Sequence, residues 1–273
     1  MTSPAMTETR NDPLPPHDMV WVPLFLARGA VTLLLLAGWE LTSRSVLDLV
    51  APPLQTLVRL AELMQSGALA AMVWTTLAET AGGLLIGAGL GVVLPFLVQM
   101  SPRWTAVIEP FARAGVGVPK LALSPILLVW FGIGMTGKVV LVALMTFFLV
   151  FVATFSGIRS VGPSLIRTVS VFGANRVDIA REVLWHSAQP FVWAALRAAL
   201  PWAINAALVG EFLAAHEGIG HYIHHSYNLA DITGVYAGIL ATVVLILVAD
   251  TLLGAVQRRS LAWRPQQVHA IPH

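Results

Sequence analysis

The strongest constraint on this sequence is a set of long apolar runs that contain no charged residue. Residues 80–102, 139–158 and 232–249 have no Asp, Glu, Lys or Arg. About 20 mostly apolar residues are needed for a helix to cross the hydrocarbon core of a bilayer. We therefore predict that each of these runs forms a transmembrane helix.

Three further apolar segments fit the same interpretation with small departures. Residues 20–41 hold Arg28 near one end, where a long side chain can reach the membrane surface, and residues 188–210 hold Arg197 near the middle. Residues 121–137 are shorter, and we expect their helix to begin near Thr105. Only 11% of the residues are charged, against roughly a quarter in soluble domains. The predicted fold is all-α, a polytopic membrane bundle of about six helices.

Two segments between these spans are more polar. Residues 52–76 alternate apolar and polar groups at helical spacing and are predicted to form an interfacial helix. Residues 159–186 form a cytoplasmic loop, in which we expect short helices over 164–172 and 175–185, separated at Gly173, before Pro190 opens the fifth span. The domain prediction is a disordered tail over 1–18, a transmembrane domain over 19–260 and a second tail over 261–273.

The basic residues set the expected orientation. Cytoplasmic loops of membrane proteins carry an excess of Lys and Arg. With the amino terminus inside, the cytoplasmic side receives most of the arginines, including the group within residues 159–186. We therefore expect both termini in the cytoplasm and residues 211–231 outside.

Three glycines within a span and two charged residues, one within a span and one at a span end, are candidates for helix contacts. Gly83, Gly87 and Gly91 recur every four residues, which suits either packing within the bundle or a self-association face. Arg197 would be costly against lipid, so it either pairs with another helix, reaches the surface, or lies at a subunit interface or polar pathway. Glu211 lies fourteen positions later and cannot pair with Arg197 within one helix. Arg113 and Lys120 are the other basic residues that could meet an anion.

Histidines gather in the expected outer loop, where His221 and His225 are four residues apart. This spacing could hold a metal on a helix, although a solvated loop has the same composition. The chain has no cysteine, and no nucleotide-binding loop of the form GxxxxGK[ST] is present. A net charge of +2 gives no indication of nucleic-acid binding.

At the loop over 159–186 the sequence resembles the permease subunits of bacterial ATP-binding-cassette importers, nearest to the branch for nitrate, sulfonates and taurine. Residues 173–184, GANRVDIAREVL, are similar to the centre and end of the family's cytoplasmic motif. The resemblance continues through residues 125–134, 196–200, 209–213 and 217–223 and covers roughly 50–265. Two departures are Arg167-Thr168-Val169 at the family's Glu-Ala-Ala positions, and Trp185-His186 where a proline is expected.

The resemblance implies a transporter subunit in a bacterial plasma membrane, not an enzyme, that moves a small and anionic solute by alternating access. Implied partners are a cytoplasmic ATPase dimer carrying ATP and Mg²⁺, an identical or homologous second permease, and an extracytoplasmic substrate-binding protein. No cofactor is expected on this chain. The ATPase-coupling residues are expected to be Arg167, Gly173, Ala174, Arg176, Asp178, Val183 and Leu184, and the pathway or interface candidates Arg197 and Glu211.

Two alternatives belong to other classes. A secondary transporter or channel without an ATPase would be expected to show paired carboxylates within the membrane. A metal-dependent membrane enzyme would use the histidines over 216–225.

Overall fold

The computed structural model describes residues 18–45, 49–214 and 216–263, in two compact units, 1–55 and 56–273. The first unit contains α1 (Asp18–Ser45), which covers the predicted first span. Its 28 residues rise about 42 Å at 1.5 Å per residue. Within this unit the Trp39 indole N–H donates to the Ala51 carbonyl at 2.9 Å. The two predicted tails lie almost entirely outside the described residues.

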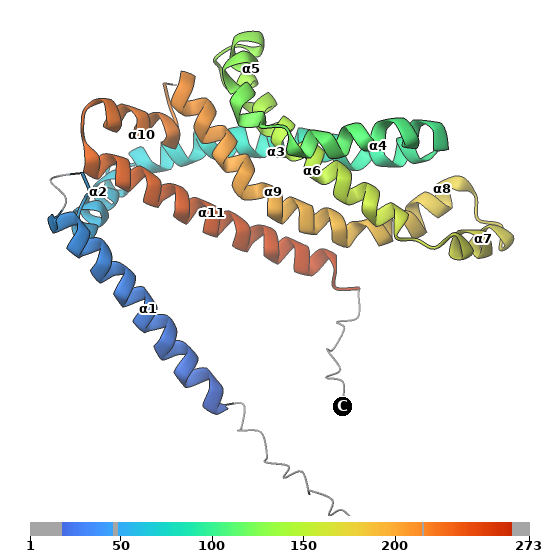
Figure 1. Ribbon diagram of the computed structural model, residues 1–273, viewed down its shortest axis with the longest axis horizontal. Helices are drawn as coiled ribbons and strands as arrows, with labels where there is room; N and C mark the ends of the chain where they lie inside the picture. The colour runs from blue at the N-terminus through green and yellow to red at the C-terminus, as the bar shows by residue number, and fades with distance from the viewer. Residues whose placement is uncertain (1–17, 46–48, 215, 264–273) are drawn as a thin grey trace, which may run out of the picture. The chain divides into compact units, whose positions relative to one another are not determined.

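Every described element of the second unit is a helix or a helical turn (Figure 1). Its elements, in chain order, are α2 (Pro53–Gln65), α3 (Ala68–Gln99), α4 (Pro102–Gly117), the 3₁₀ turn η1 (Lys120–Leu123), α5 (Ser124–Phe131), α6 (Met135–Arg159), α7 (Pro163–Val171), α8 (Arg176–Asp178), the π-helical turn η2 (Ile179–Leu184), α9 (Trp185–Ala214), α10 (Ile219–Asn228) and α11 (Ile232–Ser260).

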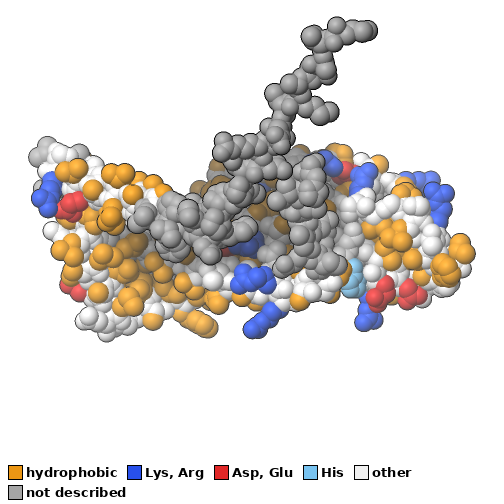
Figure 2. Space-filling view, turned by 90° about the horizontal axis from the view of Figure 1, so that it is seen from below, with side chains coloured by type: hydrophobic (Ala, Val, Ile, Leu, Met, Phe, Trp, Pro, Cys, Tyr) orange, Lys and Arg blue, Asp and Glu red, His pale blue; other side chains and the backbone are white. Residues whose placement is uncertain are grey.

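Four described helices are long and apolar enough to cross a membrane: α3, α6, α11 and the continuous helix over Arg176–Ala214. A fifth span is obtained if α4 is counted together with η1 and α5. Much of the surface seen in Figure 2 is hydrophobic, and charged side chains form small separate groups on it. The predicted helical membrane bundle is thus confirmed as the fold class.

Two predicted helix boundaries are wrong because backbone breaks interrupt otherwise apolar or amphipathic sequence. The interfacial helix expected over 52–76 ends at Gln65, since Gly67 has φ of +75° and α3 begins at once with Ala68. The second span therefore begins 12 residues before the expected Thr80. The helix expected to run from near Thr105 bends by 85° after Gly117, where Val118 is extended and Pro119 has no N–H to continue the helix.

The spaced glycines of α3 are buried against α6. A Cβ at Gly87 would lie 2.4 Å from the carbonyl oxygen of Ala143, and one at Gly83 would lie 2.3 Å from the Cβ of Val142. Gly91 faces Val150 of the same helix at 2.9 Å. Close packing within one chain therefore explains the glycine spacing, and these residues are not free to form a self-association face.

The fifth span also begins earlier than expected. After α7, the chain turns at Gly173 and then runs without interruption from Arg176 through the π-helical turn into α9. Pro190 lies inside α9 instead of opening it, so the second short helix of the loop is the first part of a span. Transmembrane helices tolerate such prolines where neighbouring groups stabilise the freed backbone.

Candidate functional site

Three large apolar side chains at the turn between α7 and α8 are exposed on the protein surface. Val171, Phe172 and Val177 are 85%, 86% and 72% exposed. Gly173 supplies the turn with φ of +91°, a backbone conformation that favours glycine. The α7–α8 turn lies at one end of α6 and α9, and α10 lies at the other (Figure 1).

A capping box fixes the start of α8. The Asn175 side chain accepts hydrogen bonds from the N–H groups of Val177 and Asp178, at 2.8 and 3.0 Å. The Asp178 carboxylate in turn accepts from the Asn175 N–H at 3.0 Å. Asp178 therefore has a local role in holding the turn in shape.

The sequence-predicted loop residues divide into two groups. Arg167, Gly173, Arg176 and Asp178 are exposed, and Ala174 is half-buried. Val183 and Leu184, the last two of the expected coupling residues, are half-buried in the π-helical turn. Sequence reasoning missed Val171 and Phe172, although two apolar residues directly before the turn glycine were a visible signal.

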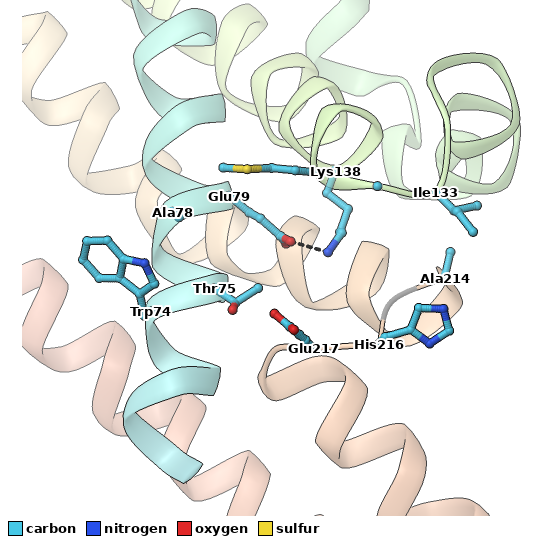
Figure 3. A pocket seen from close by; sticks show the side chains of 11 residues that line it. Trp74, Thr75, Ala78, Glu79, Ile133, Lys138, Ala214, His216 and Glu217 are labelled. Atoms are coloured by element: carbon cyan, nitrogen blue, oxygen red, sulfur yellow. Dashed lines mark hydrogen bonds and ion pairs between the residues drawn. The ribbon is translucent and has the colours of Figure 1, made fainter. Parts of the chain in front are cut away.

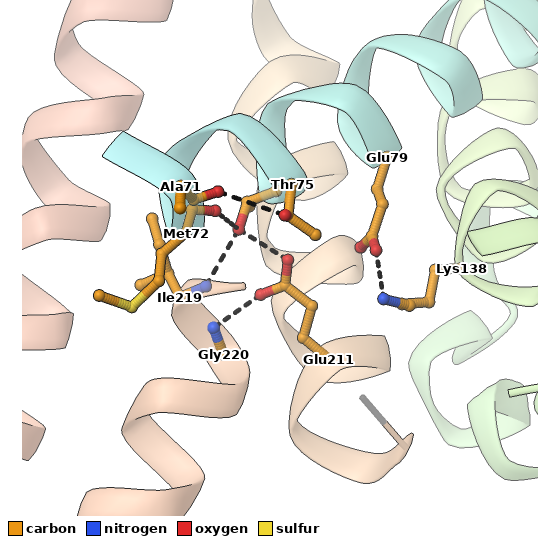
Figure 4. A network of polar contacts seen from close by, with 9 residues as sticks. Ala71, Met72, Thr75, Glu79, Lys138, Glu211, Ile219 and Gly220 are labelled. Carbon is orange, nitrogen blue, oxygen red and sulfur yellow. Dashed lines mark hydrogen bonds and ion pairs between the residues drawn. The ribbon is translucent and has the colours of Figure 1, made fainter. Parts of the chain in front are cut away.

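At the opposite end of the bundle, Glu211 is fully buried and joins three elements (Figure 4). Its carboxylate accepts from the Thr76 hydroxyl of α3 at 2.6 Å and from the Gly220 N–H of α10 at 2.6 Å. The Ile219 N–H donates to Thr76 at 3.2 Å. Glu211 thus ties the first turn of α10 to the side of α3.

An ion pair that the sequence did not predict lies beside this network. Glu79 of α3 and Lys138 of α6 are 2% and 5% exposed and are hydrogen-bonded to each other. They line a cavity of 440 Å³ together with Trp74, Thr75 and Ala78 of α3, and with Ile133, Gly134, Met135, Ala214, His216 and Glu217 (Figure 3). The two residues are 59 positions apart, so no local pattern could reveal the pair.

Arg197 does not meet Glu211. Its guanidinium forms two hydrogen bonds to the Asp250 carboxylate of α11, at 3.0 and 2.6 Å. Of the alternatives left open by the sequence, an ion pair with another helix describes this geometry. The two side chains remain 43% and 38% exposed.

The histidines of the expected outer loop lie close together in the structure. The ring centres of His216 and His221 are 6.4 Å apart, and those of His221 and His225 are 6.0 Å apart. Within the described part of the chain, no three His, Asp or Glu side chains come together as a metal site would require.

Comparison with known proteins decides the family. Residues 83–261 match the model for the inner membrane component of binding-protein-dependent transport systems. The chain belongs to this family. This permease is 29% identical to the formylaminopyrimidine transport permease protein ThiX of Halalkalibacterium halodurans, over 86% of its own length and 94% of the relative's.

Two further relatives align with the chain over a similar share of their length. The permease is 29% identical to the putative aliphatic sulfonates transport permease protein SsuC of Bacillus subtilis, covering 84% of this chain and 82% of that protein. It is 26% identical to the taurine transport system permease protein TauC of Escherichia coli, covering 87% and 89%. The predicted branch of the family is therefore confirmed.

Solved structures agree on the fold. The methionine transporter MetNI in an inward-facing conformation aligns with a TM-score of 0.58 at 19% identity, covering 68% of the permease and 93% of that chain. A bacterial importer of the acidic polysaccharide alginate aligns with a TM-score of 0.61 at 14% identity, covering 89% and 92%.

Family membership settles the class of protein. The permease is a multi-pass membrane subunit of an ATP-driven importer for small solutes, and the ATPase is a separate chain. Neither the secondary transporter nor the metal-dependent enzyme describes it.

Proposed function

We propose that two such permeases, identical or homologous, form the pathway of a bacterial importer, and that the loop over 159–186 docks a cytoplasmic ATPase dimer. ATP and Mg²⁺ are bound by the ATPase, and an extracytoplasmic substrate-binding protein delivers solute at the end of the bundle that holds α10. Alternating access then moves the solute inward. The observation that carries this proposal is the exposed apolar tip at Val171, Phe172 and Val177.

The composition around this tip argues for a protein partner. Large apolar side chains exposed together on a polar surface are typical of an interaction site. Four arginines, Arg159, Arg167, Arg176 and Arg181, surround the tip in sequence and oppose its insertion into lipid. An excess of arginine also favours the cytoplasmic side, which is the side of an ATPase. The expected cytoplasmic position of both termini follows from the same orientation.

The solute we propose is a small organic anion. The SsuC and TauC relatives are described as permeases for aliphatic sulfonates and for taurine. Because Arg167-Thr168-Val169 replaces the acidic motif that the family carries, we expect the docking contact to rely on apolar surface and on Gly173.

A valine at Gly173 is expected to weaken ATPase docking. Its Cβ would meet no atom within 4 Å, so the effect arises from the backbone, whose φ of +91° is unfavourable for a branched side chain. Strain of roughly 1–2 kcal/mol moves the turn out of shape, and we expect the Kd of the ATPase to rise about five- to thirtyfold. Titration of purified permease with the ATPase measures this change.

Gly67→Val is the matched control. Gly67 has φ of +75° and equally open surroundings, but it lies between α2 and α3. This variant should bind the ATPase as the unmodified chain does. Equal binding by Gly173→Val would count against the docking assignment.

Single cysteines test the orientation, because the chain has none of its own. Val171→Cys and Tyr227→Cys place thiols at opposite ends of the bundle. The native side chains at these positions are 85% and 65% exposed. A membrane-impermeant thiol reagent added to intact spheroplasts is expected to label Tyr227→Cys, and to label Val171→Cys only after permeabilisation. The reverse pattern would invert the proposed topology.

A further inference from the structure

Lys120 lies at the bend between α4 and η1 and is only 8% exposed. Its ammonium group donates to the carbonyl oxygens of Gly115 at 2.7 Å, Val116 at 3.0 Å and Val118 at 3.4 Å. It also lies 5.5 Å from the centre of the Phe148 ring. The carbonyls at the end of α4 carry partial negative charge and offset part of the ammonium charge.

Four other basic side chains in or beside the spans have a carboxylate partner. Lys138 pairs with Glu79, Arg197 with Asp250, and both Arg113 and Arg159 with Glu109. Within the described part of the chain, no carboxylate lies within 4.0 Å of Lys120. A buried charge without a counter-ion is costly in a medium of low polarity. The ammonium group of Lys120 is therefore offset by backbone carbonyls and the Phe148 ring rather than by a carboxylate.

Lys120 lines a cavity of 440 Å³, within the range of small-ligand sites. The other lining residues are apolar, apart from the indole N–H of Trp202: Val116, Val118, Pro119, Leu121, Met145, Leu149 and Trp202. Met145 lies ten residues after the start of α6 and fourteen before its end, so the cavity lies near the middle of that span. Broken helices at this depth form solute sites in other transporters.

We propose that this cavity is a transit site for a small organic anion, with Lys120 facing its acid group and the apolar walls holding its carbon body. The hydrogen bond to Val118 is the longest of the three, and an oxygen of the solute would take its place. This assignment names the solute class of the pathway and so rests on the proposed function.

A second cavity of the same volume provides an internal comparison. The cavity at Glu79 has Glu217 on its wall, and its one lysine, Lys138, is already paired with Glu79. Its charge therefore does not favour an anion. An anionic probe should therefore be favoured over a cationic one in the Lys120 cavity, but not in the Glu79 cavity.

The test uses the absence of native cysteine. Met145→Cys places a thiol in the Lys120 cavity and Ala78→Cys places one in the Glu79 cavity. Each variant, purified in complex with the ATPase, is reacted with two methanethiosulfonates of similar size, one carrying a sulfonatoethyl group and one a trimethylammonioethyl group. The ratio of the two rates, corrected by the ratio for a free thiol, reports local charge independently of thiol reactivity.

We expect Met145→Cys to react with the anionic reagent faster than with the cationic one by a corrected factor on the order of ten. Adding Lys120→Met should abolish this preference, and adding Lys120→Arg should keep it. Ala78→Cys should show no anion preference, with or without the Lys120 substitution.

Three outcomes would overturn the proposal. They are equal corrected rates at Met145→Cys, a preference that survives Lys120→Met, and no reaction with either reagent, which would mean that solutes cannot reach the cavity. If Lys120→Met does not fold, Met145→Cys can still be compared with Met145→Cys combined with Lys120→Arg. Equal corrected rates for the two reagents in either variant would overturn the proposal. Because labelling requires no transport, its failure is distinct from failure of the importer assignment, which ATPase binding tests separately.

Discussion

Replacing Lys138 with methionine is expected to lower the stability of the permease by about 3–5 kcal/mol, because Glu79 would remain buried without its counter-charge. One oxygen of Glu79 already has no hydrogen-bond partner among the described residues, and the buried Glu211 lies close by. Loss of the ammonium would leave two carboxylates facing each other. The midpoint of thermal unfolding in detergent should fall by roughly 10 °C.

Removing both charges should restore most of this loss. In the double variant Glu79→Gln with Lys138→Met no uncompensated charge is left at the pair, and such replacements of buried ion pairs are often close to neutral. A double-mutant cycle therefore isolates the coupling between the two residues. Additive losses from the two single substitutions would mean that the pair contributes nothing as a pair.

Arg113→Met is the matched control for Lys138→Met. Arg113 also pairs with a carboxylate, that of Glu109 at 2.7 Å, but its side chain is 64% exposed and Glu109 keeps a second partner in Arg159. An exposed pair contributes at most about 1 kcal/mol. The thermal midpoint of this variant should therefore change little.

The helical class and most spans could be predicted from the sequence because charge-free length is a local property. The breaks could not be placed in the same way. Hydropathy does not distinguish a straight apolar helix from one that bends after Gly117, and the turn at Gly67 lies within a pattern that is helical on both sides. Pro190 led to the opposite error, a break predicted where none exists. It suggested the start of a helix, but α9 continues through it.

The candidate sites also divide into those with a local sequence signal and those that depend on contacts between distant residues. Gly173 was predictable because a glycine between two short amphipathic segments is a local signal. The partners of Glu211 and Arg197 were not, because Thr76 is 135 positions from one and Asp250 is 53 positions from the other. Lys120 was identified as a basic residue, but only the fold shows that it lies buried at a bend, with no carboxylate of the described residues within 4.0 Å.

Replacing Gly218 with alanine is expected to release α10 from α3. Gly218 has φ of +103°, and a Cβ there would lie 2.2 Å from the carboxyl carbon of Glu211. The substitution adds backbone strain of roughly 1–2 kcal/mol and displaces a buried carboxylate from its donors, at a further cost of about 1–3 kcal/mol. Hydrogen exchange of a peptide covering residues 216–228 should become at least tenfold faster.

Gly132→Ala is the control for backbone strain without displacement of a buried carboxylate. Gly132 also has a positive φ, +89°, but a Cβ there would meet nothing within 4 Å, so this variant carries backbone strain alone. Its α10 peptide should exchange at the rate of the unmodified chain. Combining Gly218→Ala with Glu211→Ala removes the collision but keeps the backbone strain at residue 218. The combination should therefore exchange faster than Glu211→Ala alone only by the effect of that strain, and by less than the sum of the two single effects. Fully additive effects would show that the collision with Glu211 contributes nothing.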